Sequence, residues 1–215
     1  MLSSLHIWQT GHRIWARLQA EVAAIMEIPV YLLVMADSKR LFVGIHLPPD
    51  FQEVLSELDP HLPGLRWLEP VQMHLTLSFL GNVDSTRQED LAKCICEVRV
   101  PAFFLPLEGV GSFSARGRPS VVWVGVGRGH PHLFALHKHV QDAVLKAGLE
   151  PDLKPFHPHV TVGRAKGLSR EALQPFLRSH RDSEFGLFKV TAFTLYSSVL
   201  VSEGATHTVE LRVPL

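Results

Sequence analysis

Short apolar runs recur along the chain after residue 40, and most of them are bounded by Pro, Gly or Asn. Runs of this length, rich in Val, Ile, Leu and Phe, are typical of strands with at least one buried face. The pattern predicts strands over residues 41–45, 73–80, 103–109, 121–126, 159–162, 188–199 and 206–213. A polar loop is expected over residues 111–120, and a turn at Ser202–Gly204.

Apolar side chains at helical spacing separate several of these strands. Gly148 follows one such segment, at the position where glycine ends many helices. The pattern predicts helices that begin after Pro48, at a capping box formed by Ser85 and Gln88, near Leu133, and after a capping Ser169. Strands interleaved with helices and joined partly by hairpin-like turns predict an α+β fold with largely antiparallel sheets.

Two of the predicted strands carry the same pair of polar residues. His74 and Thr76 lie in the first, and His159 and Thr161 lie in the second, 85 residues later. Residues i and i+2 of a strand point to one face, so each strand presents an imidazole and a hydroxyl opposite an apolar face. Because the second half of the chain resembles the first, we expect two pseudo-symmetric lobes whose polar faces meet across a central cleft.

This pairing of residues suits acid–base cleavage of a phosphodiester. Two imidazoles near their reference pKa can act as base and acid in one reaction. Two threonine hydroxyls can donate hydrogen bonds to the nonbridging phosphate oxygens as charge develops there. This chemistry requires no metal and no cofactor, and none is expected.

Composition restricts the class of protein. The chain has 215 residues, 46% of them apolar, with 21 basic and 21 acidic side chains and 13 His. This balance supports a buried core and excludes a disordered acidic tail, a polycation and a polybasic membrane binder. A formal charge of zero also favours a small local contact with a phosphodiester over extensive electrostatic wrapping of a nucleic acid.

The ends of the chain and its cysteines suggest a compartment and a domain boundary. Cys94 and Cys96 fall on different faces of a predicted helix, so no disulfide between them is expected. We therefore expect a cytoplasmic location. The apolar stretch at residues 22–36 is too short to span a bilayer, and we expect no membrane contact. We expect residues 1–34 to be an extension outside the folded domain, and residues 35–215 to form a single bilobal domain.

The sequences around the two motifs resemble those of bacterial and archaeal RNA 2′,3′-cyclic phosphodiesterases, formerly called 2′-5′ RNA ligases, of the two-histidine phosphoesterase superfamily. The resemblance covers nearly all of residues 40–215. It is carried by Arg40–Ile45, His74–Leu77, Phe79–Gly81, Val122–Gly125, Pro155–Arg164, Leu195–Tyr196, Gly204–Ala205 and Pro214–Leu215. It implies a bilobal α+β fold with a central cleft, and hydrolysis of a terminal 2′,3′-cyclic phosphate to a 2′-phosphate.

The resemblance also implies the roles of individual residues. His74 would donate a proton to the departing 3′ oxygen, and His159 would be the proton acceptor that activates water. Thr76 and Thr161 would hold the phosphate. Arg164 matches a phosphate-binding arginine of the second motif, and its planar fork suits that anion.

Two aromatic positions near these motifs leave alternatives open. Phe42 could stack on a base of the substrate, although a core role is the ordinary one for a Phe in an apolar strand. His207 stands near the end of the chain at a position where relatives often carry Tyr. The role of this position is open.

Four other histidines are clustered in the sequence, and three alternative functions remain open. A metal site is a possible interpretation of His130, His132, His137 and His139, but no two of them have the i, i+4 spacing of a helical ligand pair, which favours a solvated helix start. The alternative functions are another 2′,5′- or cyclic-nucleotide phosphoesterase, RNA ligation, or a noncatalytic nucleotide-binding module. The expected partners are RNA ends or small cyclic-phosphate nucleotides, and the expected state is a monomer.

Overall fold

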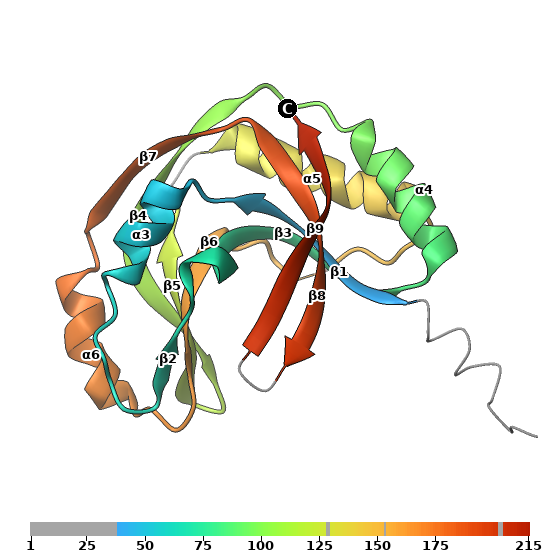
Figure 1. Ribbon diagram of the computed structural model, residues 1–215. Coiled ribbons are helices and arrows are strands. Elements are labelled where there is room, and N and C mark those ends of the chain that lie inside the picture. Colours follow the sequence, from blue (N-terminus) through green and yellow to red (C-terminus); the bar gives the residue numbers. More distant parts are fainter. Residues whose placement is uncertain (1–37, 128–129, 153, 202–203) are drawn as a thin grey trace, which may run out of the picture. The chain divides into compact units, whose positions relative to one another are not determined.

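The computed structural model of the protein describes residues 38–127, 130–152, 154–201 and 204–215 (Figure 1). The extension expected over residues 1–34 lies outside the described residues. Lys39–Leu215 form one compact unit.

This unit is built from strands and helices that alternate along its first three quarters. The strands are β1 (Lys39–His46), β2 (Leu65–Trp67), β3 (His74–Val83), β4 (Phe103–Ala115), β5 (Arg118–Gly125), β6 (His159–Ala165), β7 (Glu184–Val190), β8 (Ala192–Val201) and β9 (Gly204–Pro214). The α-helices are α3 (Pro49–Ser56), α4 (Ser85–Cys96), α5 (Pro131–Lys146) and α6 (Arg170–Ser179), and a 3₁₀ turn η1 covers Pro70–Gln72.

The strands form one antiparallel sheet whose order shows two matching halves. The order is β7-β4-β5-β6-β3-β1-β8-β9, and the short β2 pairs with β6 outside this path (Figure 1). Each half also contains a related succession of strand, helix, strand and helix. These elements are β5, α5, β6, α6 in one half and β1, α3, β3, α4 in the other, where β2 and η1 are inserted between α3 and β3. The prediction of an α+β fold with two pseudo-symmetric lobes is confirmed, with the two lobes sharing one sheet.

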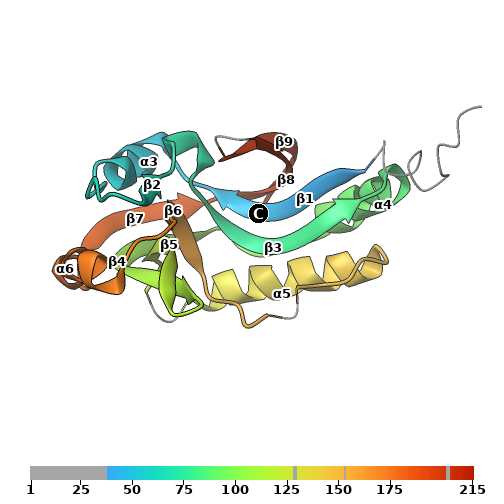
Figure 2. The ribbon, with the colours of Figure 1, turned by 90° about the horizontal axis from the view of Figure 1, so that it is seen from below.

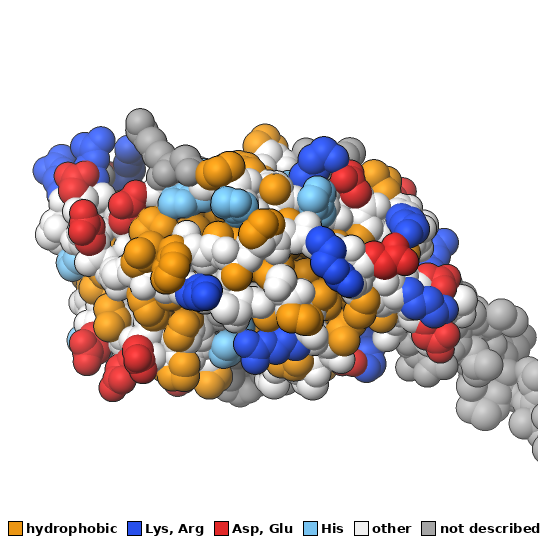
Figure 3. Space-filling view, turned by 90° about the horizontal axis from the view of Figure 1, so that it is seen from above, with side chains coloured by type: hydrophobic (Ala, Val, Ile, Leu, Met, Phe, Trp, Pro, Cys, Tyr) orange, Lys and Arg blue, Asp and Glu red, His pale blue; other side chains and the backbone are white. Residues whose placement is uncertain are grey.

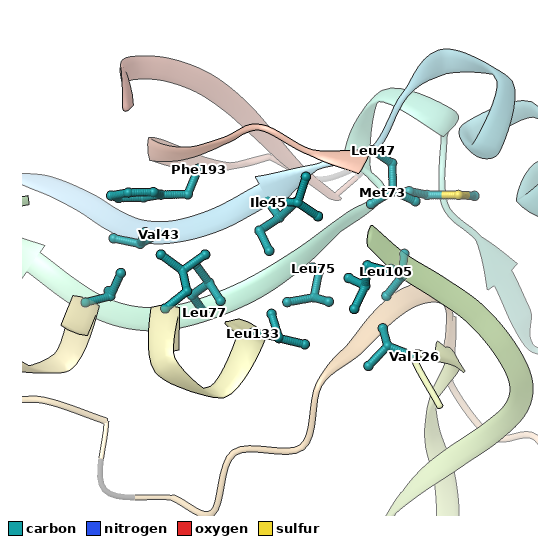
Figure 4. Close-up of a cluster of buried hydrophobic side chains, with 14 of the residues drawn as sticks. Val43, Ile45, Leu47, Met73, Leu75, Leu77, Leu105, Val126, Leu133 and Phe193 are labelled. Atoms are coloured by element: carbon teal, nitrogen blue, oxygen red, sulfur yellow. The ribbon is translucent and has the colours of Figure 1, made fainter. Parts of the chain in front are cut away.

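The hydrophobic core lies between this sheet and its helices. Leu75 and Leu77 of β3 point toward Leu133 of α5 (Figure 4). The buried stripe of α5 consists of Leu133, Leu136, Val140, Ala143 and Val144, and this helix packs against β3 and α4 (Figure 2). One face of β3 is thereby sealed from water, and the other face remains available for polar side chains.

The helix ends agree with the sequence in two places and differ in one. Ser169 caps α6 by accepting a hydrogen bond from Ala172 N, and Gly148 follows α5 with a φ of 72°. The capping box predicted at Ser85 is wrong. Asp84 is the cap of α4, and its carboxylate accepts from Arg87 N at 3.0 Å. A carboxylate is a strong cap and lies one residue earlier, so the helix begins at Ser85 itself.

The polar loop predicted over residues 111–120 is also wrong. Strands β4 and β5 continue through most of that segment and leave only a tight turn at Arg116 and Gly117. Both turn residues have positive φ, 51° and 77°, as the commonest two-residue hairpin turn requires. The Ser and Gly residues at the end of β4 are typical of loops, but pairing with β5 holds them in the sheet.

The apolar run predicted as one strand over residues 188–199 forms two strands. β7 ends at Val190 and pairs with β4, whereas β8 begins at Ala192 and pairs with β1. The chain therefore passes from one half of the sheet to the other at Thr191. Periodicity cannot detect this crossing because both strands are apolar up to the junction.

Replacing Leu75 tests how far the stability of the fold depends on the face of β3 that packs against α5. Its side chain is fully buried, so Leu75→Ala should lower the free energy of unfolding by about 2–5 kcal/mol through lost burial and a residual cavity. Leu187→Ala is the matched control, because that side chain is 58% exposed on β7 and its loss should cost at most about 0.5 kcal/mol. Urea unfolding of both variants measures the difference. Equal costs would contradict this description of the core.

Candidate active site

The two His-x-Thr motifs lie on neighbouring strands at the centre of the sheet. β3 and β6 pair in antiparallel register at Leu75 and Val160. These two residues share a face, so the residues that flank them share the opposite face. Antiparallel register sets His74 opposite Thr161 and Thr76 opposite His159. Each imidazole thus lies across the strand pair from the hydroxyl of the other motif.

A β-bulge follows each motif at the same position. Pairing skips Leu77 between β3 and β1, and it skips Val162 between β6 and β5. A bulge shifts the alternation of side chains by one residue. The residue three positions after each threonine therefore lies on the exposed face that carries the motif, and not on the buried face. This residue is Phe79 in one half and Arg164 in the other.

His74 is held by a backbone carbonyl and by aromatic rings. Its Nδ1 lies 2.8 Å from the Gln72 carbonyl oxygen, which can only accept, so Nδ1 carries the hydrogen and Nε2 remains for chemistry. Its ring stacks on Phe42 at 4.7 Å between centroids and contacts His207 edge-on at 5.1 Å. Burial, followed by the nearby His207, lowers the pKa of His74 to about 4.

His159 is held in the same way in the other half of the sheet. Its Nδ1 lies 2.6 Å from the His157 carbonyl oxygen, which again leaves Nε2 as the unengaged nitrogen. Phe113 of β4 contacts the ring edge-on, with centroids 4.9 Å apart, and Trp123 of β5 lies 6.3 Å away. Burial lowers the pKa of His159. Both imidazoles are therefore neutral at pH 7 when no anion is bound.

Two adjoining hollows open onto the polar face of the two strands. One, called here the His74 hollow, encloses about 700 Å³ of space including open solvent. It is lined by Arg40, Leu41, Phe42, Arg66, Leu68, Gln72, His74, Thr76, Phe79, Thr161, Arg164, Ser198, Leu200, Ala205 and His207. The other, the His159 hollow, is lined by Thr76, Leu77, Ser78, Phe79, Phe113, His137, Gln141, Asp152, Lys154, Pro155, Phe156, His157 and His159. Thr76 and Phe79 line both hollows, and the two together are called the cleft.

The structure thus gathers five of the six residues predicted from the sequence around one cleft surface. Phe42, the sixth, also borders the cleft, but its side chain is only 3% exposed. Its ring stacks on His74 and on Tyr196, the latter with centroids 4.9 Å apart. This burial favours the core role weighed for Phe42 over stacking on a base. The exposed aromatic side chain of the cleft is Phe79, at 54%.

Sequence reasoning missed Phe79, Arg40 and Arg66 as cleft residues. A signal for Phe79 was present, because it stands three residues after Thr76 as Arg164 stands three after Thr161. Arg40 precedes Phe42 by two residues in β1, which places it on the same face. Arg66 had no local signal, because it reaches the cleft through the pairing of β2 with β6.

The histidines near α5 are not arranged as a metal site. Among the residues that the structure describes, no group of three or more His, Cys, Asp or Glu side chains could hold a metal ion. His132 and His139 are exposed, as expected for a solvated helix start. His137 differs from that expectation. It is half-buried, stacks on Phe156 with centroids 4.0 Å apart, and lies in the His159 hollow.

Comparison with known proteins identifies relatives over most of the chain. A protein-family model for the 2′-5′ RNA ligase superfamily matches residues 37–200. The chain is 36% identical over 178 residues to the RNA 2′,3′-cyclic phosphodiesterase of Aquifex aeolicus, covering 79% of this chain and 94% of that protein. It is 34% identical to the protein of the same name from Archaeoglobus fulgidus, with 81% and 98% covered.

A similar solved structure is that of Escherichia coli LigT complexed with 3′-AMP. It superposes with a TM-score of 0.68 at 28% sequence identity and covers 83% of this chain and 98% of LigT. The family match spans most of the folded unit and includes both His-x-Thr strands. The chain belongs to the 2′-5′ RNA ligase superfamily.

Proposed function

We propose that this protein hydrolyses 2′,3′-cyclic phosphates at RNA ends, or on small nucleotides, to 2′-phosphomonoesters. The observation that carries the proposal is the pair of half-buried imidazoles whose Nδ1 atoms are both held by carbonyls, on one face of adjacent strands. The names of the relatives, RNA 2′,3′-cyclic phosphodiesterase, and the 3′-AMP bound by LigT support the same substrate chemistry.

The reaction follows from these positions. His159 Nε2 takes a proton from water, and the water oxygen forms a bond to phosphorus. The bond from phosphorus to the 3′ oxygen breaks, and that oxygen receives the proton of His74 Nε2. The product carries a 2′-phosphate and a free 3′-hydroxyl. Thr76 and Thr161 donate hydrogen bonds to the nonbridging oxygens, and Arg164 offers its guanidinium to the same charge.

His74 must be protonated to act as the acid, although its pKa is low in the free protein. A bound phosphodiester supplies it, because a negative charge beside an imidazole favours the imidazolium form. The bound anion also offsets the positive charge of Arg164, which lowers the pKa of His74 in the free protein. Substrate binding and formation of the acid are thus coupled through one electrostatic interaction.

Further parts of this proposal concern the metal, the location and the oligomeric state. The imidazoles, hydroxyls and guanidinium together supply an acid, a base and charge stabilisation, so we infer a metal-independent reaction. No described helix is long and apolar enough to cross a membrane. The free thiols of Cys94 and Cys96 favour a reducing, cytoplasmic setting. One chain provides both motifs, which supports action as a monomer.

Replacing either imidazole tests the mechanism. His74→Ala and His159→Ala should each lower kcat on an RNA with a 2′,3′-cyclic end by about 10²- to 10⁴-fold, the usual contribution of a general acid or base. His132→Ala, at an exposed position at the start of α5, is the control and should retain wild-type kcat. Product analysis by ³¹P NMR should detect the 2′-phosphate.

A variant His74→Ala as fast as the wild type would contradict the mechanism. Activity that is lost with EDTA and restored by zinc would contradict its metal independence. Product analysis on 2′,5′-linked adenylates and on a 5′-hydroxyl acceptor RNA distinguishes the alternative phosphoesterase and ligation reactions.

The pH dependence of the rate should report the lowered pKa values. The reactive form of the free protein has one imidazole protonated and the other neutral, and both pKa values lie below 6.5. Above about pH 6.5, kcat/KM should therefore fall tenfold per pH unit as the proton of the acid is lost. The fall in kcat should begin at higher pH, since the bound anion raises the pKa of the acid. A flat kcat/KM between pH 6.5 and 8.5 would contradict this.

A further inference from the structure

The His74 hollow is lined by more arginines than one reacting phosphate needs. Arg40 of β1, Arg66 of β2 and Arg164 of β6 all line it. Among its described lining residues there is no Asp or Glu. A single phosphodiester carries one negative charge, and it already meets two hydroxyls, an imidazole and Arg164 in the reaction derived above.

Two of these arginines are placed directly opposite each other. Arg66 pairs with Arg164 in the ladder between β2 and β6. Like charges at opposite positions of adjacent strands destabilise a sheet. Burial lowers the pKa of Arg164, and the nearby cations Arg66 and Arg40 lower it further. The ladder thus places two arginine side chains where they can face one anion together.

The surrounding structure keeps space for the Arg66 side chain in the cleft. Its neighbour Trp67 points the other way, where Nε1 donates to the Leu55 carbonyl oxygen at 3.0 Å. On the cleft side, Arg66 lies against the start of β9. A Cβ on Gly204 would lie 3.0 Å from Arg66 Nη1, so a larger residue there would push the guanidinium aside. The glycine thus leaves room for Arg66 between β2 and the β8–β9 hairpin.

We propose that Arg40 and Arg66, together with Arg164, bind a second phosphate of the substrate, the phosphodiester on the 5′ side of the terminal nucleotide. This proposal rests on the proposed function and deepens it. It predicts that the enzyme prefers a terminal nucleotide that has a 5′-phosphate as well as the cyclic phosphate. The last nucleotide of an RNA chain has both, whereas a nucleoside 2′,3′-cyclic phosphate lacks the 5′-phosphate. The planar guanidinium forks supply paired N–H donors to such a phosphate.

The test compares substrates that differ only in the second phosphate. Adenosine 2′,3′-cyclic phosphate is compared with its 5′-phosphorylated form and with the dinucleotide ApA ending in a cyclic phosphate. In the wild type, kcat/KM should be about 10- to 100-fold higher for the two compounds with a 5′-phosphate, the range expected for hydrogen bonds between charged groups. Equal preference for these two compounds would assign the effect to the phosphate, and a preference for the dinucleotide alone would assign it to the added nucleoside and overturn the proposal.

The double variant Arg40→Gln, Arg66→Gln should bring the ratio of kcat/KM between phosphorylated and unphosphorylated substrates close to one. Arg118→Gln is the control for loss of one positive charge, because Arg118 is exposed at the start of β5 and outside both hollows. It should keep the wild-type ratio. A ratio near one in the wild type, or an unchanged ratio in the double variant, would overturn the second phosphate site.

A binding measurement separates this outcome from failure of the proposed function. Calorimetry compares adenosine 2′-phosphate with adenosine 2′,5′-bisphosphate, and neither is turned over. The wild type should bind the bisphosphate about 10- to 100-fold more tightly, and the double variant should bind the two alike. Absence of hydrolysis of every cyclic phosphate, together with this binding difference, would refute the reaction but leave the second phosphate site. Equal binding with intact hydrolysis would do the reverse.

Discussion

The pairing of β3 with β6 at Leu75 and Val160 is the contact on which the rest of the site depends. It joins the two halves of the sheet, and it sets the phase of both motif strands at once. A shift of one residue in a strand moves every side chain to the other face. Such a shift would put an imidazole and a hydroxyl into the core and Leu75 into the cleft. The buried contact with α5 on the far face therefore fixes the chemistry on the near face.

The same geometry explains why the two imidazoles differ from free histidine. Each ring is fixed by a carbonyl two residues earlier and is packed by aromatic side chains from other strands of its own half. This packing orients Nε2 but removes water from the ring, and loss of water disfavours the charged form. In the proposed mechanism, His74 therefore stays neutral until the anionic substrate binds. Positioning and a low pKa have one physical cause here.

The protein has no formal net charge, but its charged side chains are unevenly distributed. The chain carries equal numbers of basic and acidic side chains, and both signs occur on the face shown in Figure 3. The His74 hollow nevertheless gathers three arginines from three different strands. The two β-bulges contribute to this asymmetry, because the equivalent positions after the two motifs hold Phe79 in one half and Arg164 in the other. One half of the cleft thus offers an aromatic surface where the other offers a cation.

The sequence by itself determined the fold class, most strands and helices and the two His-x-Thr strands, because period-two patterns and short motifs are local properties. Its failures were of three physical kinds. A stronger cap displaced Ser85, strand pairing absorbed a segment with loop-like composition, and an apolar run hid the crossing at Thr191. Only the tertiary structure decided that Phe42 is buried, that the bulges turn Phe79 and Arg164 into the cleft, and that Arg66 faces Arg164. These facts depend on which strands pair and in what register, and pairing partners lie too far apart in the sequence for any local pattern to specify.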